Sequence, residues 1–262
     1  MSKSESASPA LTQSVTRALG ILSCFTDERP ELRAGDVAKI MNLTPSNVSR
    51  LLTTMVTLGY VEKDELSGLY RLGDQIITLG GIALNNSEIR KLALPELYDL
   101  EGRLGLGANL AVRKGSSMFY LAHVDSRHAP RMYTLLGRTN PLYCTGIGKV
   151  LLAHAKEPES DMKQIELIGY TEHTLTDRAA LLEELAAVRR RGYAVEVEEL
   201  ARGRACIAAP IRGRSGKIVA GLSLSGPLSD IRLPEREGEL AGVVIEVADR
   251  ISVKLGFLSA QA

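Results

Sequence analysis

A single change of hydrophobic period near Gly59 limits what the N-terminal quarter of this chain can fold into. Before Gly59, apolar residues recur at helical spacing, and one helix face over 12–25 would carry Val15, Ala18, Leu19, Leu22 and Phe25. A second short helix is expected at 33–41. After Gly59 the pattern is that of two short strands, 60–63 and 69–73, around a turn at 64–68. Three helices followed by a hairpin predict a winged helix-turn-helix.

The third helix, over 45–58, has the clearest local signals. Thr44 is a good N-cap residue, and Pro45 suits the first helical position. Gly59 is placed to end the helix. The apolar spacing predicts a buried stripe formed by Val48, Leu51, Leu52 and Met55.

The chain from 74 to about 104 has a helical pattern in two pieces, separated by 85–87. The first piece is mostly apolar, so we expect it to pack against another surface. Ser87 is expected to cap the second piece. Pro95 lies inside that pattern and should either kink the helix or mark its true start.

Beyond residue 105, strand and helix patterns are mixed. Strands are predicted at 109–113, 118–124, 193–197, 204–212 and 217–225, and helices at 148–154, 177–191 and 234–255. This mixture predicts an α+β domain with a mainly antiparallel sheet. The chain therefore divides into a polar tail (1–10), a winged helix (11–73), a linker helix (74–88) and a larger domain (89–260).

Composition excludes several classes of protein. With 262 residues, 45% of them hydrophobic, the chain has enough apolar material for sizeable cores, which excludes wholesale disorder. A net charge of +1 excludes a strongly basic coat for nucleic acid. Three widely spaced cysteines are not a disulfide framework, which favours a reducing cytoplasm. We expect no secretory signal and no membrane span.

The predicted third helix has side chains suited to reading DNA. In a helix-turn-helix, the second helix of the pair enters the major groove. Asparagine pairs with adenine, and arginine pairs with guanine or a phosphate. Candidate contacts near the start of this helix are Thr44, Ser46, Asn47, Ser49 and Arg50, with Arg17 and Arg71 as candidate phosphate contacts on neighbouring elements.

Charge balance leaves an alternative open for this domain. Residues 1–85 contain eight basic and nine acidic side chains, which does not favour DNA, and a winged helix also serves as a protein-interaction adaptor. The placement of charge favours DNA, because the acidic residues gather in the first inter-helix loop and the wing turn. The groove-facing helix carries Arg50 as its one charge.

Common enzyme motifs are absent from the larger domain. A phosphate-binding loop around Gly146 would need glycine at 143 and serine or threonine at 150, where the chain has Tyr143 and Val150. The glycines at 105 and 107 lack the third glycine of a dinucleotide fingerprint. The histidines show no zinc-site spacing, so no metal and no cofactor is predicted. An enzyme that acts on a small acid through Cys206 or Glu196 remains an alternative.

A small-molecule pocket is the better-supported prediction for this domain. The strand at 206–211 begins at Cys206 and is rich in small residues. In the strand at 222–225, Ser223 and Ser225 share one face. The stretch 145–148 opens a helix whose free N–H groups suit a carboxylate. Glu196, if it faces inward, would accept hydrogen bonds from ligand hydroxyls. Exposed serines and an ordinary glycine turn are the simpler interpretations.

Ordered blocks along the chain resemble the IclR family of bacterial transcription regulators over about 11–260. They are SVTRALGIL (14–22), SNVSRLL (46–52), LGYV (58–61), YRLG (70–73), PLYCTGIGK (141–149), RGYA (191–194), EE (198–199) before Gly203, CIAAPI (206–211) and LSLSGP (222–227). The resemblance implies a winged-helix DNA-binding domain, a linker helix and a GAF-like effector domain. It also implies homodimers formed through the N-terminal region, often paired into dimers of dimers.

The resemblance further implies a ligand site between the glycine loop and the sheet. Matching the family's motifs to this sequence assigns the ligand site to Gly146, Ile147, Cys206, Ser223, Ser225 and Glu196. The family often has aspartate at position 196, so the longer glutamate changes the expected pocket size. Thr16 stands before Arg17 where a basic residue is usual, and Asn47 stands where threonine is usual. Both departures would alter the preferred operator.

A narrower resemblance is to members that sense sugar-derived keto acids, such as the ketodeoxygluconate regulators. It rests on 131–133, 137–138, 140–143 and 148–152. Aromatic acids and glyoxylate-like acids are the competing effectors. The sequence thus predicts a cytoplasmic transcription regulator, more often a repressor than an activator, that binds a palindromic operator in double-stranded DNA and is controlled by a small organic acid.

Overall fold

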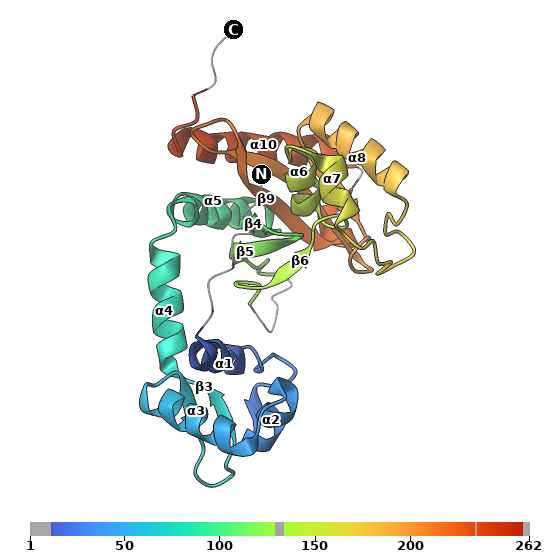
Figure 1. Cartoon of the computed structure of the whole chain (residues 1–262). Coiled ribbons are helices and arrows are strands. Elements are labelled where there is room, and N and C mark those ends of the chain that lie inside the picture. The colour runs from blue at the N-terminus through green and yellow to red at the C-terminus, as the bar shows by residue number, and fades with distance from the viewer. Residues whose placement is uncertain (1–11, 129–133, 234, 259–262) are drawn as a thin grey trace, which may run out of the picture. The chain divides into compact units, whose positions relative to one another are not determined.

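The computed structural model describes residues 12–128, 134–233 and 235–258. The chain divides into two compact units, residues 1–83 and 84–262. The predicted tail at 1–10 and the motif at 131–133 lie outside the described residues. Figure 1 shows the elements of both units, each of which is described by itself below.

The first unit is a winged helix-turn-helix. Helices α1 (Gln13–Leu22), α2 (Ala34–Met41) and α3 (Pro45–Thr57) pack beside a small sheet in the order β1-β3-β2, formed by Glu31–Leu32, Tyr70–Leu72 and Val61–Lys63. The predicted stripe of α3 is buried at Val48, Leu52 and Met55 and half-buried at Leu51. Gly59 follows the helix with a φ of +76°, which glycine adopts without strain. The predicted winged helix-turn-helix fold is confirmed.

Helix α1 confirms only part of the predicted apolar face, because Ala18 and Leu22 pack against the core together with Phe25, which follows the helix. Ile21 is fully buried, whereas Val15 and Leu19 remain 53% and 60% exposed. Period alone shows that residues share a face, and does not show which face meets the core. The exposed pair therefore forms an apolar strip on the outside of the first unit.

Helices α4 (Asp74–Asn85) and α5 (Glu88–Leu104) follow, broken near Asn86 as predicted. Helix α4 has no buried residue, so the described part of the chain does not supply the expected packing partner. Ser87 occupies the N-cap position of α5, but its side chain makes no capping hydrogen bond. Pro95 lies inside α5 and does not mark its start. The helix tolerates this proline because Ala93, Leu97 and Leu100 are buried on either side of it.

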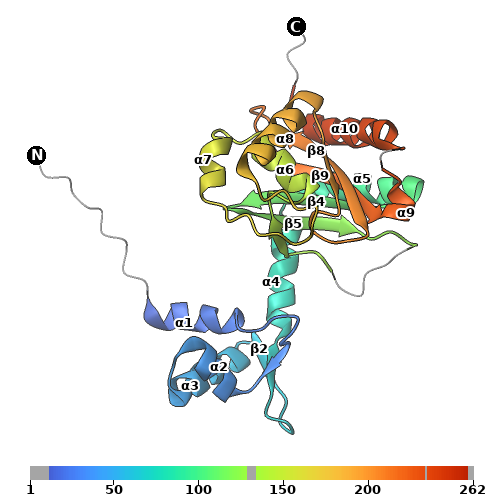
Figure 2. The same cartoon turned by 90° about the vertical axis from the view of Figure 1, so that its right-hand side faces the viewer.

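The second unit is built on a six-stranded antiparallel sheet in the order β6-β5-β4-β9-β8-β7. The strands are β4 (Gly107–Lys114), β5 (Ser117–Val124), β6 (Thr139–Pro141), β7 (Ala194–Val197), β8 (Arg204–Arg212) and β9 (Ile218–Pro227). Helices cover both faces of the sheet (Figure 2). They are α6 (Gly146–Ala153), α7 (Pro158–Lys163), α8 (Arg178–Arg191), α9 (Leu228–Ile231) and α10 (Glu237–Lys254). The predicted α+β class is confirmed.

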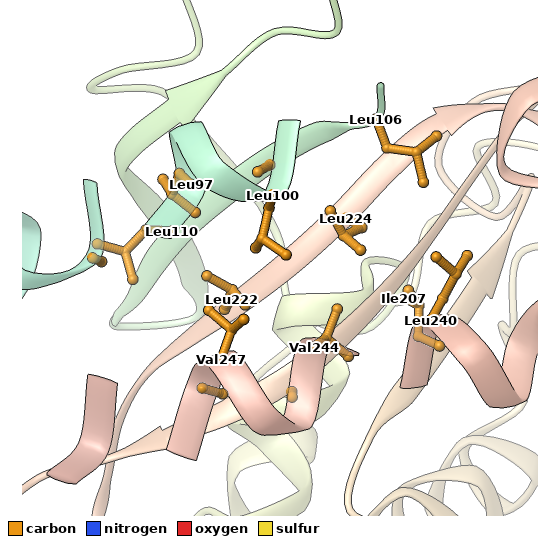
Figure 3. Packing of buried hydrophobic residues seen from close by; sticks show 14 of the residues in the cluster. Leu97, Leu100, Leu106, Leu110, Ile207, Leu222, Leu224, Leu240, Val244 and Val247 are labelled. Carbon is orange, nitrogen blue, oxygen red and sulfur yellow. The ribbon is translucent and has the colours of Figure 1, made fainter. Parts of the chain in front are cut away.

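Alternation along the central strands gives the sheet two cores. On one face, Leu222 and Leu224 of β9 pack with leucines of α5 and β4 and with residues of α10 such as Val244 (Figure 3). On the other face, α6 and α8 cover small residues such as Ala208. Residues at alternate positions of β9 point to the second face, which places Ser223 and Ser225 toward α6. Within the described ranges, no helix is both long and apolar enough to cross a membrane.

Candidate functional site

The start of α3 presents the polar surface predicted for DNA contact. Thr44 is the N-cap, and its Oγ1 accepts a hydrogen bond from the Asn47 N–H at 3.4 Å. Ser46, Ser49 and Arg50 are exposed. Thr44 is therefore occupied in starting the helix, while the side chains that follow it face solvent.

The α1 and α3 candidates gather on one surface. Arg17 lies on α1, and it lines a shallow depression together with Asn47, Ser49 and Arg50 of α3. Arg71 lies apart, on β3 of the wing, and its guanidinium contacts the Glu62 carboxylate at 2.8 Å. This exposed ion pair must rearrange if Arg71 is to hold a phosphate.

In the second unit, a pocket of about 300 Å³ lies between the first turn of α6 and the sheet. The strand register explains how distant residues meet there. Glu196 is paired with Cys206, and Cys206 with Ser225, across β7, β8 and β9. All six pocket residues predicted from the sequence line this one cavity, namely Gly146, Ile147, Glu196, Cys206, Ser223 and Ser225.

Small residues allow α6 to lie directly on the sheet. A Cβ atom added at Gly146 would lie 2.8 Å from the Cys206 Sγ, and one added at Gly221 would lie 2.7 Å from the Ile147 Cγ2. Thr145 begins the helix, because its Oγ1 accepts from the Gly148 N–H at 3.2 Å. These contacts fix the start of α6 over β8 and β9, with the N-terminal end of the helix at the pocket.

The N–H groups of this first turn are only partly available to a ligand. The Gly148 N–H is held by Thr145, and the Gly146 N–H faces the sulfur of Cys206. The Ile147 N–H has no hydrogen-bond partner among the described residues. The helix start therefore offers one free donor beside the positive end of a short helix dipole.

Glu196 faces inward as the prediction required, but its carboxylate oxygens already accept hydrogen bonds within the protein. Its Oε1 accepts from the N–H groups of Glu199 and Leu200 at 2.6 and 3.2 Å, and its Oε2 lies 3.4 Å from the Cys206 Sγ. Burial raises the pKa of the Glu196 carboxyl, against the lowering effect of these backbone hydrogen bonds. The side chain thus anchors the loop after β7 and also forms one wall of the pocket.

Behind this wall lies a buried ion pair that the sequence analysis did not find. The Lys149 ammonium is 2% exposed and contacts the Glu199 carboxylate, and it lies 4.0 Å from Glu184. Burial raises the pKa of Glu199, although the lysine acts to lower it. The pair links α6 to the loop that Glu196 anchors, so it stabilises the shape of the pocket.

The chemistry of Cys206 does not suit a nucleophile. Burial raises the pKa of its thiol well above the ordinary value, and the neighbouring Glu196 raises it further. A thiol in this setting stays protonated and unreactive at neutral pH. The described residues include no group of three or more histidine, cysteine, aspartate or glutamate side chains arranged to hold a metal ion.

The polar pocket residues that were missed from the sequence include Asn109 and Arg204. Asn109 of β4 donates through Nδ2 to the Ser223 and Ser225 Oγ atoms at 3.2 and 3.1 Å. Arg204 lines the rim. It stands two residues before Cys206 in the same strand, so strand alternation alone would have placed it on the pocket face. Asn109 was recognisable only as a polar residue inside an apolar strand.

Comparison with known proteins agrees with both units. The IclR helix-turn-helix domain matches residues 14–65, and the C-terminal domain of the bacterial transcriptional regulator IclR matches residues 81–253. The regulator KdgR of Escherichia coli is 35% identical over 251 residues, covering 95% of each chain. The repressor AllR of E. coli is 31% identical over 250 residues, covering 93% of this chain and 90% of its own.

A solved structure gives the same result. An IclR homologue from Microbacterium hydrocarbonoxydans, in complex with 4-hydroxybenzoate, superposes with a TM-score of 0.81 at 26% identity, over 93% of this chain and 99% of its own. These relatives are regulators, so the enzyme hypothesis for Cys206 and Glu196 is not retained. The chain belongs to the IclR family of DNA-binding bacterial transcription regulators.

Proposed function

We propose that this protein is a repressor of a catabolic operon, and that a small organic acid controls its binding to a palindromic operator. The observation that carries the proposal is the pocket beneath α6, where Ser223, Ser225 and the free Ile147 N–H meet in about 300 Å³. That volume lies at the small end of the range for ligand sites, which suits a metabolite-sized acid. The similarity to AllR, a transcriptional repressor, supports the sign of regulation.

In this proposal Ser46, Asn47, Ser49 and Arg50 read base edges in the major groove, and Arg17 and Arg71 hold phosphates. The exposure of Ser46, Ser49 and Arg50 supports the first role, and the depression shared by α1 and α3 supports the placement of Arg17. Thr44 acts by capping α3. Base contacts of this kind determine sequence preference, whereas phosphate contacts set position and affinity.

The effector we favour is a sugar-derived keto acid. The similarity to KdgR and the narrower resemblance to ketodeoxygluconate regulators support this choice, as do the polar groups at both ends of the pocket, Asn109 with the serines and Glu196 opposite. The 4-hydroxybenzoate complex of a homologue keeps aromatic acids as the main alternative, with glyoxylate-like acids as the next.

The functional unit we propose is a homodimer, alone or paired into a dimer of dimers. Helix α4 supports this because its apolar side chains are exposed in the single chain, at 75% for Ile77 and 54% for Ile82. An exposed apolar helix gains most of its stability from a packing partner. A second copy also matches a two-fold operator, with half-sites spaced by about 34–36 Å or a multiple of that distance. Residues 74–88 would transmit the effector signal.

Calorimetry with the purified full chain tests the effector assignment. We would titrate 2-keto-3-deoxygluconate, 4-hydroxybenzoate and glyoxylate into the wild type and into a Ser223→Ala/Ser225→Ala variant. The proposal expects the sugar acid to bind most tightly, and the double variant to lose at least about tenfold in affinity because two hydrogen bonds to a charged group are removed. Equal affinity in the two proteins would place the acid elsewhere.

A further inference from the structure

The serine pair in the pocket has a buried organiser, Asn109. It lies in β4 directly opposite Ser223 of β9, and its amide Nδ2 donates to the Ser223 Oγ at 3.2 Å and to the Ser225 Oγ at 3.1 Å. Asn109 and Ser223 are 3% and 4% exposed, so solvent does not compete strongly for these hydrogen bonds. One amide group therefore determines the environment of both hydroxyls.

Local backbone geometry allows this reach. Ser225 is paired with Gly107, two residues before Asn109 on the same strand. A Cβ atom at Gly107 would lie 3.4 Å from the Ser225 Oγ. Because glycine leaves that space open, the Asn109 side chain extends diagonally to the second serine while it keeps the first.

The direction of these hydrogen bonds decides what the serines can bind. A hydroxyl has a single proton to donate. Since both Oγ atoms accept from Asn109, neither proton is used on the amide, and neither has an acceptor among the described residues. Both protons are therefore available to an acceptor in the pocket.

The neighbouring groups at this end of the pocket are also donors. Ile147 of α6 packs against Gly221 of β9, and its N–H is free among the described residues. Two hydroxyl protons and an N–H at a helix start form a site for a carboxylate, and each hydrogen bond to a charged oxygen is stronger than one to a neutral oxygen.

We propose that Asn109 is a positioning residue that makes Ser223 and Ser225 paired donors, and so makes the pocket select acids over neutral molecules of the same shape. This inference rests on the proposed effector site and names its carboxylate subsite. If the hydrogen bonds ran in the opposite direction, both serines would donate to the Asn109 Oδ1. Their hydroxyl oxygens would then be left as acceptors, and the pocket would favour a neutral ligand that donates hydrogen bonds.

The Asn109→Asp variant distinguishes the two hydrogen-bond directions with almost no change in side-chain shape. An aspartate accepts hydrogen bonds only, so both serine protons would turn to it and would no longer serve the ligand. The matched control is Asn140→Asp, because Asn140 lines the same pocket but donates its amide to the Tyr120 hydroxyl at 3.2 Å. The control adds the same charge to the pocket and leaves the serines unchanged.

The probes are propionate and propionamide, which have nearly the same shape and differ in charge. Binding to the full chain is followed by NMR, through the amide signals of Gly146, Ile147 and Ser225. In the wild type, propionate is expected to bind at least about tenfold more tightly than propionamide. Asn109→Asp is expected to abolish or reverse this preference, and Asn140→Asp to keep it. In a Ser223→Ala/Ser225→Ala background, Asn109→Asp should change the preference less than it does in the wild type, because only the repulsion between the two negative charges then remains.

Folding of each variant is checked by thermal unfolding, and Asn109→Ala is measured beside Asn109→Asp in case the aspartate does not fold. Alanine should weaken propionate binding while keeping some preference for the acid. The inference is overturned if a folded Asn109→Asp retains the wild-type preference, or if propionate does not bind the wild type. Operator binding is measured separately in the same proteins. If no operator is found while the propionate preference behaves as stated, the proposed function fails and the role of Asn109 stands.

Discussion

At the scale of single residues, Glu196 couples the pocket to pH. Its carboxyl is 7% exposed, and burial raises its pKa above the usual value near 4.5. At a pH between the unfolded-state pKa and the raised folded-state pKa, the Glu196 carboxyl is protonated in the folded chain and ionised in the unfolded chain. The contribution of this group to stability is therefore complete below about pH 4.5 and is lost as pH rises through the folded-state pKa.

Urea unfolding of the wild type and of Glu196→Gln checks this sign. Glutamine does not ionise, so the free energy of unfolding of the wild type, relative to the variant, should fall as pH rises above about 4.5 and through the raised folded-state pKa of Glu196. The slope should not exceed about 1.4 kcal/mol per pH unit for one proton. A relative stability that rises with pH would mean that the backbone N–H groups of Glu199 and Leu200 outweigh burial.

A second residue-scale prediction concerns Arg50 on α3. Replacing Arg50 with alanine should weaken operator binding by about 1–3 kcal/mol, roughly 5- to 150-fold, because a side chain of this kind supplies a base or phosphate contact. Fluorescence anisotropy at fixed salt measures the change. Arg103→Ala is the control, since Arg103 is an exposed arginine on α5 that pairs with Asp99. Unchanged affinity in Arg50→Ala would contradict the assigned role of α3.

At the scale of elements, two glycines in helices have opposite surroundings. A Cβ atom at Gly148 would lie 2.1 Å from the Leu142 carbonyl oxygen and 2.4 Å from the Thr145 Oγ1, both of which hold the start of α6. A Cβ atom at Gly242, in α10, would meet nothing within 4 Å. The same substitution is therefore expected to act in opposite directions at the two sites.

Thermal unfolding of the alanine variants tests this expectation. Gly242→Ala should stabilise the chain by about 0.5–1 kcal/mol, because alanine loses less backbone entropy in a helix than glycine does. Gly148→Ala should destabilise it by at least about 2 kcal/mol and weaken acid binding, since the added methyl group would displace the first turn of α6 from the preceding segment at Leu142 and Thr145. Equal melting temperatures for the two variants would show that the start of α6 does not depend on this close contact.

Elements with long patterns were predictable from the sequence, and several short elements were not. The strand β8 was predicted at its observed bounds, because small and branched residues run unbroken from Arg204 to Arg212. Strands β1 and β6 and helices α7 and α9 were missed, because two to six residues contain too few repeats to set a period. Pro95 was expected either to kink the helix or to mark its start, and it lies inside α5, where burial of the helix offsets the local penalty of a proline.

The site could be predicted only where a motif ran along one strand or turn. The two serines of 222–225 could be predicted as a pair because they are close in sequence. The same is true of the two glycines of 145–148. The link from Asn109 to Ser223 spans 114 positions and depends on the β4–β9 register, which nothing in the sequence specifies. The Lys149–Glu199 pair was missed for the same reason.

At the scale of the whole molecule, the exposed face of α4 predicts the assembly. Ile77→Glu/Ile82→Glu places two charges on this apolar face and should shift the protein from dimer to monomer. Sedimentation velocity measures the change, and Thr78→Glu, at an exposed polar position on the same helix, is the control. A double variant that remains dimeric at micromolar concentration would place the proposed interface elsewhere.

The central claim joins the two units, because one chain reads DNA and senses an acid. The most direct measurement is to select genomic fragments from the source organism with the purified full chain, and then to titrate the recovered DNA–protein complex with small organic acids. We predict recovery of one palindromic site, release of the protein by one acid, and affinity that falls steeply with salt. Recovery of random fragments only, or a palindrome that no acid releases, would contradict it.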